Sequence, residues 1–354
     1  MTRLPRWADL VLVPLISLAL AFGLSALVIL AIGQDPWEAL RTMVTGALGS
    51  SYGWGYTLYY ATNFIFTGLA VAVAAHAGLF NIGAEGQASL GGLGVALVAL
   101  ALPWPHWGVA LPVAMVGAAL FGAMWAFIPA ILQAKRGSHI VITTIMFNFL
   151  AAALLNWLLV NVLRPPGSMD PASARFPEST QLPRLTDMAA AVGIEWGKST
   201  PANISFLIAL AACVLVWLLI WRSRLGFEIR AFGKSEPAAL YAGINPVRIT
   251  VIAMLISGGL AGLAGAIEVM GVTGYVTTSL SPGYGYFGIV VAMLANLNPL
   301  GVVAAALFSA TMFVGADAMG RTLGVPSYIA DVTVALSLLA MLVALFFTQY
   351  RVRR

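Results

Sequence analysis

Long apolar runs, separated by short polar or proline-containing segments, dominate the chain from residue 10 to residue 348. Most runs are about 17 to 25 residues long, the length with which an α-helix crosses the hydrocarbon core of a bilayer. They lack the alternation of apolar and polar positions over about ten residues that marks a barrel strand. The pattern therefore predicts an all-α integral membrane protein. The ten predicted spans are 10–32, 56–77, 80–102, 108–132, 140–162, 204–221, 249–272, 285–297, 300–316 and 327–348.

The eighth and ninth predicted spans are short, and the sequence NLNPLG at 296–301 separates them. Its proline and glycine are typical of a tight turn, but the two runs can also be read as one kinked span, which would give nine helices. The positive-inside rule decides between these alternatives. Nine spans would place the basic C-terminal sequence QYRVRR outside the cell, whereas ten spans leave both termini in the cytoplasm. We therefore expect ten spans.

Basic residues are concentrated where the ten-span arrangement predicts cytoplasmic segments. Those segments hold 12 of the 18 lysines and arginines, and they are 1–9, 133–139, 222–248 and 349–354. Only 9% of the residues are charged and 60% are hydrophobic, whereas a typical soluble domain is about 25% charged. The first apolar run is too long for a signal-peptide core and lacks a small-residue cleavage site, so we expect a retained first helix. We expect residues 1–354 to form a single transmembrane domain.

Two connections between predicted spans are too long to be simple turns. The predicted outer connection, 163–203, contains six prolines and equal numbers of acidic and basic residues. Its length exceeds that of an ordinary loop and suggests a function or a partner. The predicted inner connection, 222–248, has five basic residues against two acidic ones.

Part of the inner connection, SEPAALYAG at 235–243, predicts a short surface helix. Ser235 is a typical N-cap, an acidic residue and a proline follow in the first turn, and a glycine ends the helix. Small side chains give this helix a flat face. The residues alone leave two interpretations open: a connector on anionic lipid headgroups, or a segment that docks on a cytoplasmic partner. The residues of the candidate docking segment are Arg230, Lys234, Glu236, Ala238, Ala239 and Gly243.

Polar side chains recur at helical spacing inside three predicted spans. In the third span, Asn81, Glu85 and Ser89 are four residues apart and are predicted to share one helix face. A charged side chain at the bilayer centre costs at least about 2.5–3.5 kcal/mol, so Glu85 and Glu268 are expected to face the bundle interior or a water-filled path. For the neutral residues, hydrogen bonding between helices is the alternative. The candidate translocation-pathway residues are Asn81, Glu85, Gln87, Ser89, Thr144, Asn148 and Glu268.

The sequence carries no pattern typical of a metal, cofactor or nucleotide site. One cysteine and three scattered histidines give no metal-ligand spacing. The sequence GIEWGKST at 193–200 is similar to a phosphate-binding loop but has three residues, not four, between its first glycine and its Gly-Lys pair. We therefore expect no cofactor, no nucleic-acid partner and no hydrolysis of ATP by this chain itself.

Five stretches of the chain are distinctive: TGLAVAVAAHAGLFNIGAEGQ (67–87), AKRGSHIVITTIMFNFL (134–150), RLGFEIRAFGKSEPAALYAGI (224–244), GGLAGLAGAIEVMGVTG (258–274) and GYGYFGIVVAMLANLNPLG (283–301). They resemble the permeases of ABC importers in the branched-chain amino acid, ribose and nucleoside superfamily. The sequence FNIGAEGQ is similar to the nucleoside and simple-sugar branch. The resemblance implies a permease in the bacterial cytoplasmic membrane, with nucleosides as the first expected substrate and simple sugars as the second.

The resemblance also implies partners and an architecture. A cytoplasmic ATP-binding subunit is expected to dock on the coupling segment within 222–248, and an external substrate-binding lipoprotein is expected to deliver the solute. A second permease subunit, expected to be a different chain, completes the pathway. Ten spans divided into two groups of five would form inverted repeats. An ion-coupled secondary transporter that uses Glu85 and Glu268 is the alternative, but it leaves the coupling segment unexplained. A membrane enzyme would need a nucleophile with a base, or a metal cluster, which the spans do not offer.

Overall fold

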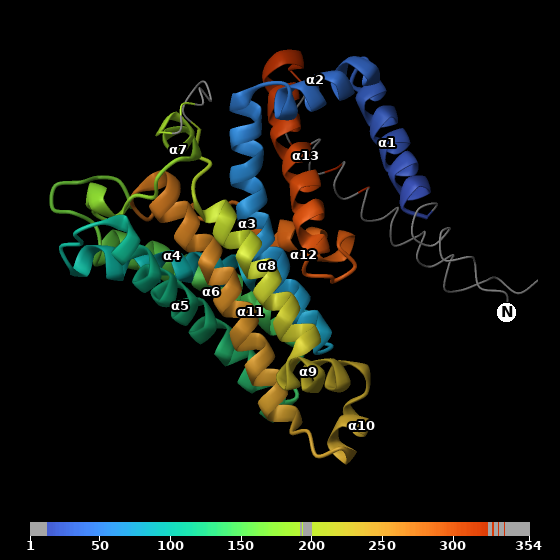
Figure 1. The fold of residues 1–354 in the computed structure, drawn as a ribbon, viewed down its shortest axis with the longest axis vertical. Coiled ribbons are helices and arrows are strands. Elements are labelled where there is room, and N and C mark those ends of the chain that lie inside the picture. The colour runs from blue at the N-terminus through green and yellow to red at the C-terminus, as the bar shows by residue number, and fades with distance from the viewer. Residues whose placement is uncertain are drawn as a thin grey trace, which may run out of the picture. The chain divides into compact units, whose positions relative to one another are not determined.

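The chain is all-helical in the part that the computed structural model describes, apart from two isolated β-bridges. The described residues are 13–191, 193, 200–324, 328, 332 and 336. Within them, seven helices are long and apolar enough to cross a membrane, so the chain is an all-α membrane protein (Figure 1). Most of the predicted tenth span, most of the segment 193–200 and both chain ends lie outside the described residues.

The long helices in chain order are α3 (Ser51–His76), α4 (Ala84–Ala101), α5 (Trp107–Arg136), α6 (Ile140–Asn161), α8 (Ser205–Arg222), α11 (Pro246–Glu268) and α13 (Gly301–Leu323). Two further apolar helices are α1 (Val13–Ala31) and α12 (Tyr284–Leu294). The short helices are α2 (Pro36–Leu48), α7 (Leu185–Ala191), α9 (Arg224–Lys234) and α10 (Glu236–Tyr241). Single turns lie at η2 (Glu178–Thr180) and η3 (Val269–Thr273), and η3 is a π-turn.

Several features differ from the sequence-based prediction. The NLNPLG turn does separate two helices, but the second of them, α13, extends to Leu323 rather than to 316. α4 begins at Ala84 instead of residue 80. The helix α2 was not predicted; it begins where Asp35 accepts a hydrogen bond from the amide of Trp37 and Pro36 occupies the first turn.

The chain divides into two compact units, which are described separately. One unit combines residues 1–57 with 308–354. In it, Ile29 of α1, Ala39 of α2 and Met319 of α13 form a small buried cluster. The other unit, residues 58–307, holds the main core and most of the candidate functional residues.

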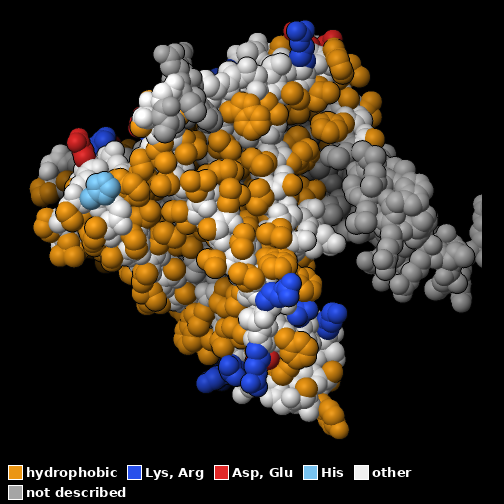
Figure 2. All heavy atoms as spheres, in the orientation of Figure 1, with side chains coloured by type: hydrophobic (Ala, Val, Ile, Leu, Met, Phe, Trp, Pro, Cys, Tyr) orange, Lys and Arg blue, Asp and Glu red, His pale blue; other side chains and the backbone are white. Residues whose placement is uncertain are grey.

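Small residues bring α4, α5 and α11 close together in the larger unit. A Cβ atom added at Gly91 would lie 2.3 Å from the main-chain oxygen of Gly262, and one added at Gly122 would lie 2.2 Å from that of Gly258. Close backbone approach of this kind is how membrane helices gain packing energy. In contrast, the outer faces of α5, α6 and α8 expose apolar side chains, as a lipid-facing surface does (Figure 2).

The two long connections lie at opposite ends of α11. The connection between α6 and α8 packs against residues that follow the C-terminal end of α11, where the amide of Leu182 donates to the oxygen of Met270 at 3.0 Å. The other connection forms α9 and α10, which contact the N-terminal part of α11. Because α11 has 23 residues and is about 35 Å long, these connections are separated by roughly the thickness of a bilayer (Figure 1).

Candidate functional site

The helix α4 begins in the interior of the helix bundle. The amide of Gly86, in its first turn, donates to Oδ1 of Asn148 at 2.9 Å. Asn148 is the ninth residue of α6 and lies about 12 Å along that helix. The non-helical segment 77–83 therefore returns from the end of α3 into the bundle before α4 starts.

Asn81 fixes this returning segment to two other helices. Its Nδ2 atom donates to Oε1 of Gln87 and to Oγ of Ser257, both at 2.8 Å, and its Oδ1 accepts from the amide of Gly83 at 2.9 Å. The Ser257 hydroxyl donates in turn to the main-chain oxygen of Ala70 at 2.6 Å, which connects α11 to α3. Asn81, Gln87 and Ser257 are buried, so this network satisfies polar groups that would otherwise be costly in the membrane.

The remaining neutral candidates also bond within the chain. The Nδ2 atom of Asn148 donates to the main-chain oxygen of Ile82 at 2.9 Å, and the buried Thr144 donates to an oxygen one turn earlier in α6 at 2.8 Å. Ser89 donates to the main-chain oxygen of Glu85 at 3.0 Å. The structure thus gathers the candidates of α4 and α6 around the start of α4. The predicted helical face of Asn81, Glu85 and Ser89 is wrong at its first member, because Asn81 precedes the helix.

Glu85 supplies the N-terminal cap of a different helix. Its Oε1 accepts from the amide of Gly283 at 2.8 Å, and its Oε2 accepts from the amide of Gly285 at 2.7 Å. These amides lie at the start of α12, where helical amides have no partner in their own helix and where the helix dipole favours a negative charge. Gly283 is the N-cap residue and has no side chain to perform this role. Glu85 therefore joins the start of α4 to the start of α12.

Glu268, the last residue of α11, binds two tyrosines that the sequence analysis did not identify. The hydroxyls of Tyr59 and Tyr284 both donate to its Oε2 atom, the second at 3.3 Å, and the two hydroxyl oxygens are 3.1 Å apart. A buried carboxylate requires donors of this kind. Their only sequence signal is that each tyrosine lies near the start of an apolar run. Since Tyr284 stands between Gly283 and Gly285, the two acids hold the start of α12 from two sides.

The candidate docking segment folds much as predicted at its ends. The hydroxyl of Ser235 accepts from the amide of Ala238 at 3.4 Å, and Gly243 has a φ of 80°, which terminates the helix. Its predicted docking face is wrong at Ala239, which is only 2% exposed. The following Leu240 and Tyr241 are 61% and 97% exposed and form the outward surface instead.

The basic residues beside α10 differ in their availability. Arg230, which was expected to face a partner, donates from Nε to the main-chain oxygen of Ile220 at 3.0 Å, and its guanidinium lies 4.5 Å from the centre of the Trp221 ring. Arg230 therefore caps the C-terminal end of α8. Lys234 is exposed and has no ion pair among the described residues. Basic side chains nevertheless gather over α9 and α10 in Figure 2.

Comparison with known proteins agrees with these features. The family described as "Branched-chain amino acid transport system / permease component" matches residues 53–345. A guanosine ABC transporter permease protein from Bacillus subtilis (strain 168) is 36% identical over 93% of this chain and 92% of its own length. A nucleoside ABC transporter permease protein from Lactococcus lactis subsp. cremoris is 34% identical over 92% of this chain and 88% of its own length. A glucose ABC transporter permease protein from Haloferax volcanii is 33% identical over 96% of this chain and 89% of its own length.

The family match covers most of the chain and includes both the Glu85 and Glu268 regions and the α9–α10 connection. Together with the seven long apolar helices among the described residues, the family match identifies a multi-pass protein of the cytoplasmic membrane. The resemblance inferred from the sequence is therefore confirmed. The chain belongs to the family of branched-chain amino acid transport system permease components, which are membrane-spanning subunits of ABC importers.

Proposed function

We propose that this permease carries nucleosides into the cell, with simple sugars as the second candidate. The observation that carries this choice is the 36% identity to a guanosine permease over nearly the full length of both chains. The structure supports an uncharged solute. Helix starts inside a transporter can bind anionic groups of a substrate, but here the amides of Gly86, Gly283 and Gly285 are already occupied by Asn148 and Glu85.

Uptake measurements test the substrate. Cells that express the complete importer should accumulate radiolabelled guanosine, and deletion of this permease should abolish that uptake. Excess unlabelled adenosine or cytidine should compete, and glucose should not. Uptake of glucose without uptake of any nucleoside would overturn the choice of substrate and leave the importer assignment intact.

We propose that Glu85, Ser89 and Glu268 border the translocation pathway. All three keep some exposed surface or lie at the limit of burial, whereas Asn81 and Gln87 are buried. Asn81, Gln87, Thr144 and Asn148 would then form the wall behind the pathway and hold its shape through the hydrogen bonds described above.

We propose ten spans in a single transmembrane domain, with two inverted halves and both termini in the cytoplasm. Support comes from the third and eighth predicted spans, α4 and α12, whose starts meet at Glu85. From its start to its end, α12 packs first near Tyr60 and then near Ala72 of α3. In contrast, α11 packs first near Ala70 and then near Tyr59, so it runs along α3 in the opposite direction. α4 runs alongside α11. From their starts within the bundle, α4 and α12 therefore run in opposite directions, as inverted repeats require.

We propose three protein partners. A separate ATP-binding subunit docks on α9 and α10, where Leu240, Tyr241 and Lys234 are exposed. A helix of six residues such as α10 is too short to be stable by itself, so it needs packing surfaces on both sides. An external substrate-binding lipoprotein docks at the other end of α11, and a second, different permease chain completes the pathway. Purification of this chain should recover both an ATPase and a second permease; recovery of this chain alone, fully active in ion-driven uptake, would favour the secondary transporter.

A further inference from the structure

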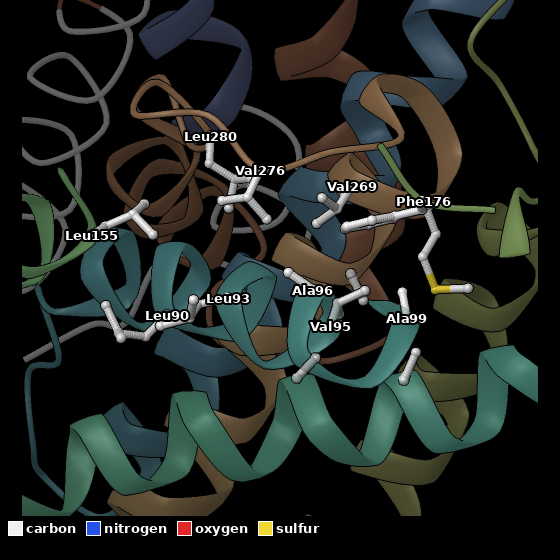
Figure 3. Packing of buried hydrophobic residues seen from close by; sticks show 14 of the residues in the cluster. Leu90, Leu93, Val95, Ala96, Ala99, Leu155, Phe176, Val269, Val276 and Leu280 are labelled. Carbon is white, nitrogen blue, oxygen red and sulfur yellow. The ribbon is translucent and has the colours of Figure 1, made fainter. Parts of the chain in front are cut away.

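One face of α8 carries an apolar stripe that ends at a group of aromatic and basic residues. The apolar side chains of the main core are buried between helices (Figure 3). In contrast, Val214, Leu218 and Trp221 of α8 are exposed, and their spacing places them on one side of the helix. α8 has 18 residues and is about 27 Å long, so Trp221 lies near one boundary of the hydrocarbon core. The stripe therefore faces lipid acyl chains and leads to the membrane boundary where α9 begins.

Two arginines are held on tryptophan rings at this boundary. The guanidinium of Arg222 lies 5.5 Å from the centre of the Trp217 ring, and that of Arg230 lies 4.5 Å from the centre of the Trp221 ring. Because Trp217 and Trp221 are one helical turn apart, the two arginine–tryptophan pairs are adjacent. Neither arginine forms an ion pair within the part of the chain that the structure describes. Both positive charges are therefore available to a ligand.

The first turns of α9 add a third arginine and an exposed aromatic ring. α9 folds back closely on α8, since a Cβ atom added at Gly226 would lie 2.0 Å from the main-chain oxygen of Leu219. The Arg224 side chain is 94% exposed, and its Nε lies 3.3 Å from Oε1 of Glu228. Phe227 is 60% exposed. We refer to residues 214–230 as the α8–α9 corner; its one acidic residue stands against three arginines, so its net charge is positive.

An anionic phospholipid matches each property of the α8–α9 corner. Its acyl chains suit the apolar stripe, and its phosphate suits guanidinium groups, which bind phosphate through two parallel N–H bonds. Arginines that already rest on aromatic rings lose less freedom when they bind a ligand. A soluble partner could match the charge but could not reach the stripe, because the stripe lies within the hydrocarbon layer. The combination of stripe and charge therefore favours a lipid.

We propose that the α8–α9 corner binds an anionic phospholipid, with the phosphate beside Arg222 and Arg230 and the acyl chains along Val214 and Leu218. Trp217 acts as a positioning residue, because its ring holds the Arg222 guanidinium at the boundary. The proposed topology places this lipid in the cytoplasmic leaflet. The inference does not depend on which solute the permease carries.

Native mass spectrometry of the complete importer tests the proposal. The purified complex is titrated with short-chain phosphatidylglycerol and, separately, with short-chain phosphatidylcholine, and the ratio of the two Kd values gives the preference for the anionic lipid. Arg222→Gln should reduce this preference about 5-fold, the effect of one basic residue at an anionic membrane surface. Arg136→Gln is the matched control: Arg136 is exposed at the end of α5, on the same side of the bundle as α9, and lies over no ring among the described residues. It should keep the preference of the wild type.

A second variant tests the positioning role without any change of charge. Trp217→Leu removes the ring beneath Arg222, and we expect it to reduce the preference about 2- to 5-fold. Trp217→Phe should restore part of the loss, since it returns an aromatic face. The Tm of both variants should match that of the wild type. An unchanged preference in Trp217→Leu would show that the ring does not position Arg222.

Inorganic phosphate distinguishes a lipid site from a site for a free anion. Phosphate should not displace phosphatidylglycerol at equal concentration, because it has no acyl chains to contact the stripe; displacement would refute the lipid assignment. The site is also refuted if Arg222→Gln keeps the preference of the wild type. An equal loss in Arg222→Gln and Arg136→Gln would refute it as well, because the effect would then be a general attraction between basic residues and anionic lipid.

Discussion

Removal of the Glu85 carboxylate gives the sharpest test of how the centre of this permease is built. Glu85→Ala leaves the amides of Gly283 and Gly285 without their acceptors. Hydrogen bonds between membrane helices contribute on average about 0.6 kcal/mol each, with a maximum near 1.7. A negative charge at a helix start adds about 0.3–1 kcal/mol. We therefore expect the variant to lose about 1.5–4 kcal/mol of stability, most of it at the start of α12.

Two readouts separate stability from transport. Thermal unfolding of the purified complex, followed by tryptophan fluorescence, should show a lower Tm for Glu85→Ala, by roughly 2–4 °C per kcal/mol. Glu85→Gln keeps one acceptor oxygen but places an amide group opposite an N–H donor. Its Tm should therefore lie between those of Glu85→Ala and the wild type. Ser89→Ala is the control, because its hydroxyl bonds only within α4.

Uptake decides what else Glu85 does. If Glu85 acts only as a cap, transport should fall in proportion to the amount of folded complex. If it also borders the pathway, Glu85→Gln should lose more uptake than its Tm explains. A variant Glu85→Ala with the Tm of the wild type would show that the capping argument is wrong.

Three further outcomes follow from contacts described above. Asn148→Ala should lower the Tm by several degrees because Gly86 loses its partner, whereas Asn156→Ala, on the exposed face of the same helix, should not. Gly262→Ala should destabilise the complex or prevent its assembly, since the new Cβ would meet a main-chain oxygen at 2.3 Å; Gly23→Ala, with open space around it, should be neutral in the same thermal assay. Tyr241→Asp should reduce copurification of the ATPase without lowering the amount of permease in the membrane, and normal copurification would exclude Tyr241 from the docking surface.

The membrane class and most helices could be predicted because apolar length alone specifies a membrane span. The start of α4 could not, because Asn81 continues the helical spacing of Glu85 and Ser89, yet tertiary hydrogen bonds to Gln87 and Ser257 hold it outside the helix. Local patterns carry no information about such distant partners.

For the candidate site, even less could be predicted from local sequence patterns. Both intramembrane acids were identified because an unpaired charge is costly in a bilayer, which makes any such residue conspicuous. The hydrogen-bond partners of these acids were not identified from the sequence. Glu85 binds amides about 200 residues later in the chain, and main-chain amides have no side-chain signature. For α10, the caps were predictable from local chemistry, whereas the burial of Ala239 depends on how α10 packs in the folded chain.

The bond between Glu85 and the start of α12 has a consequence for biogenesis. During synthesis, α4 enters the membrane long before residues 283 and 285 exist, so its carboxylate waits without its final partners. α12 has 11 residues, about half of a bilayer span, and is too short to insert as an independent helix. The acceptor that the first half of the chain carries at Glu85 is therefore completed only after the second half has been made.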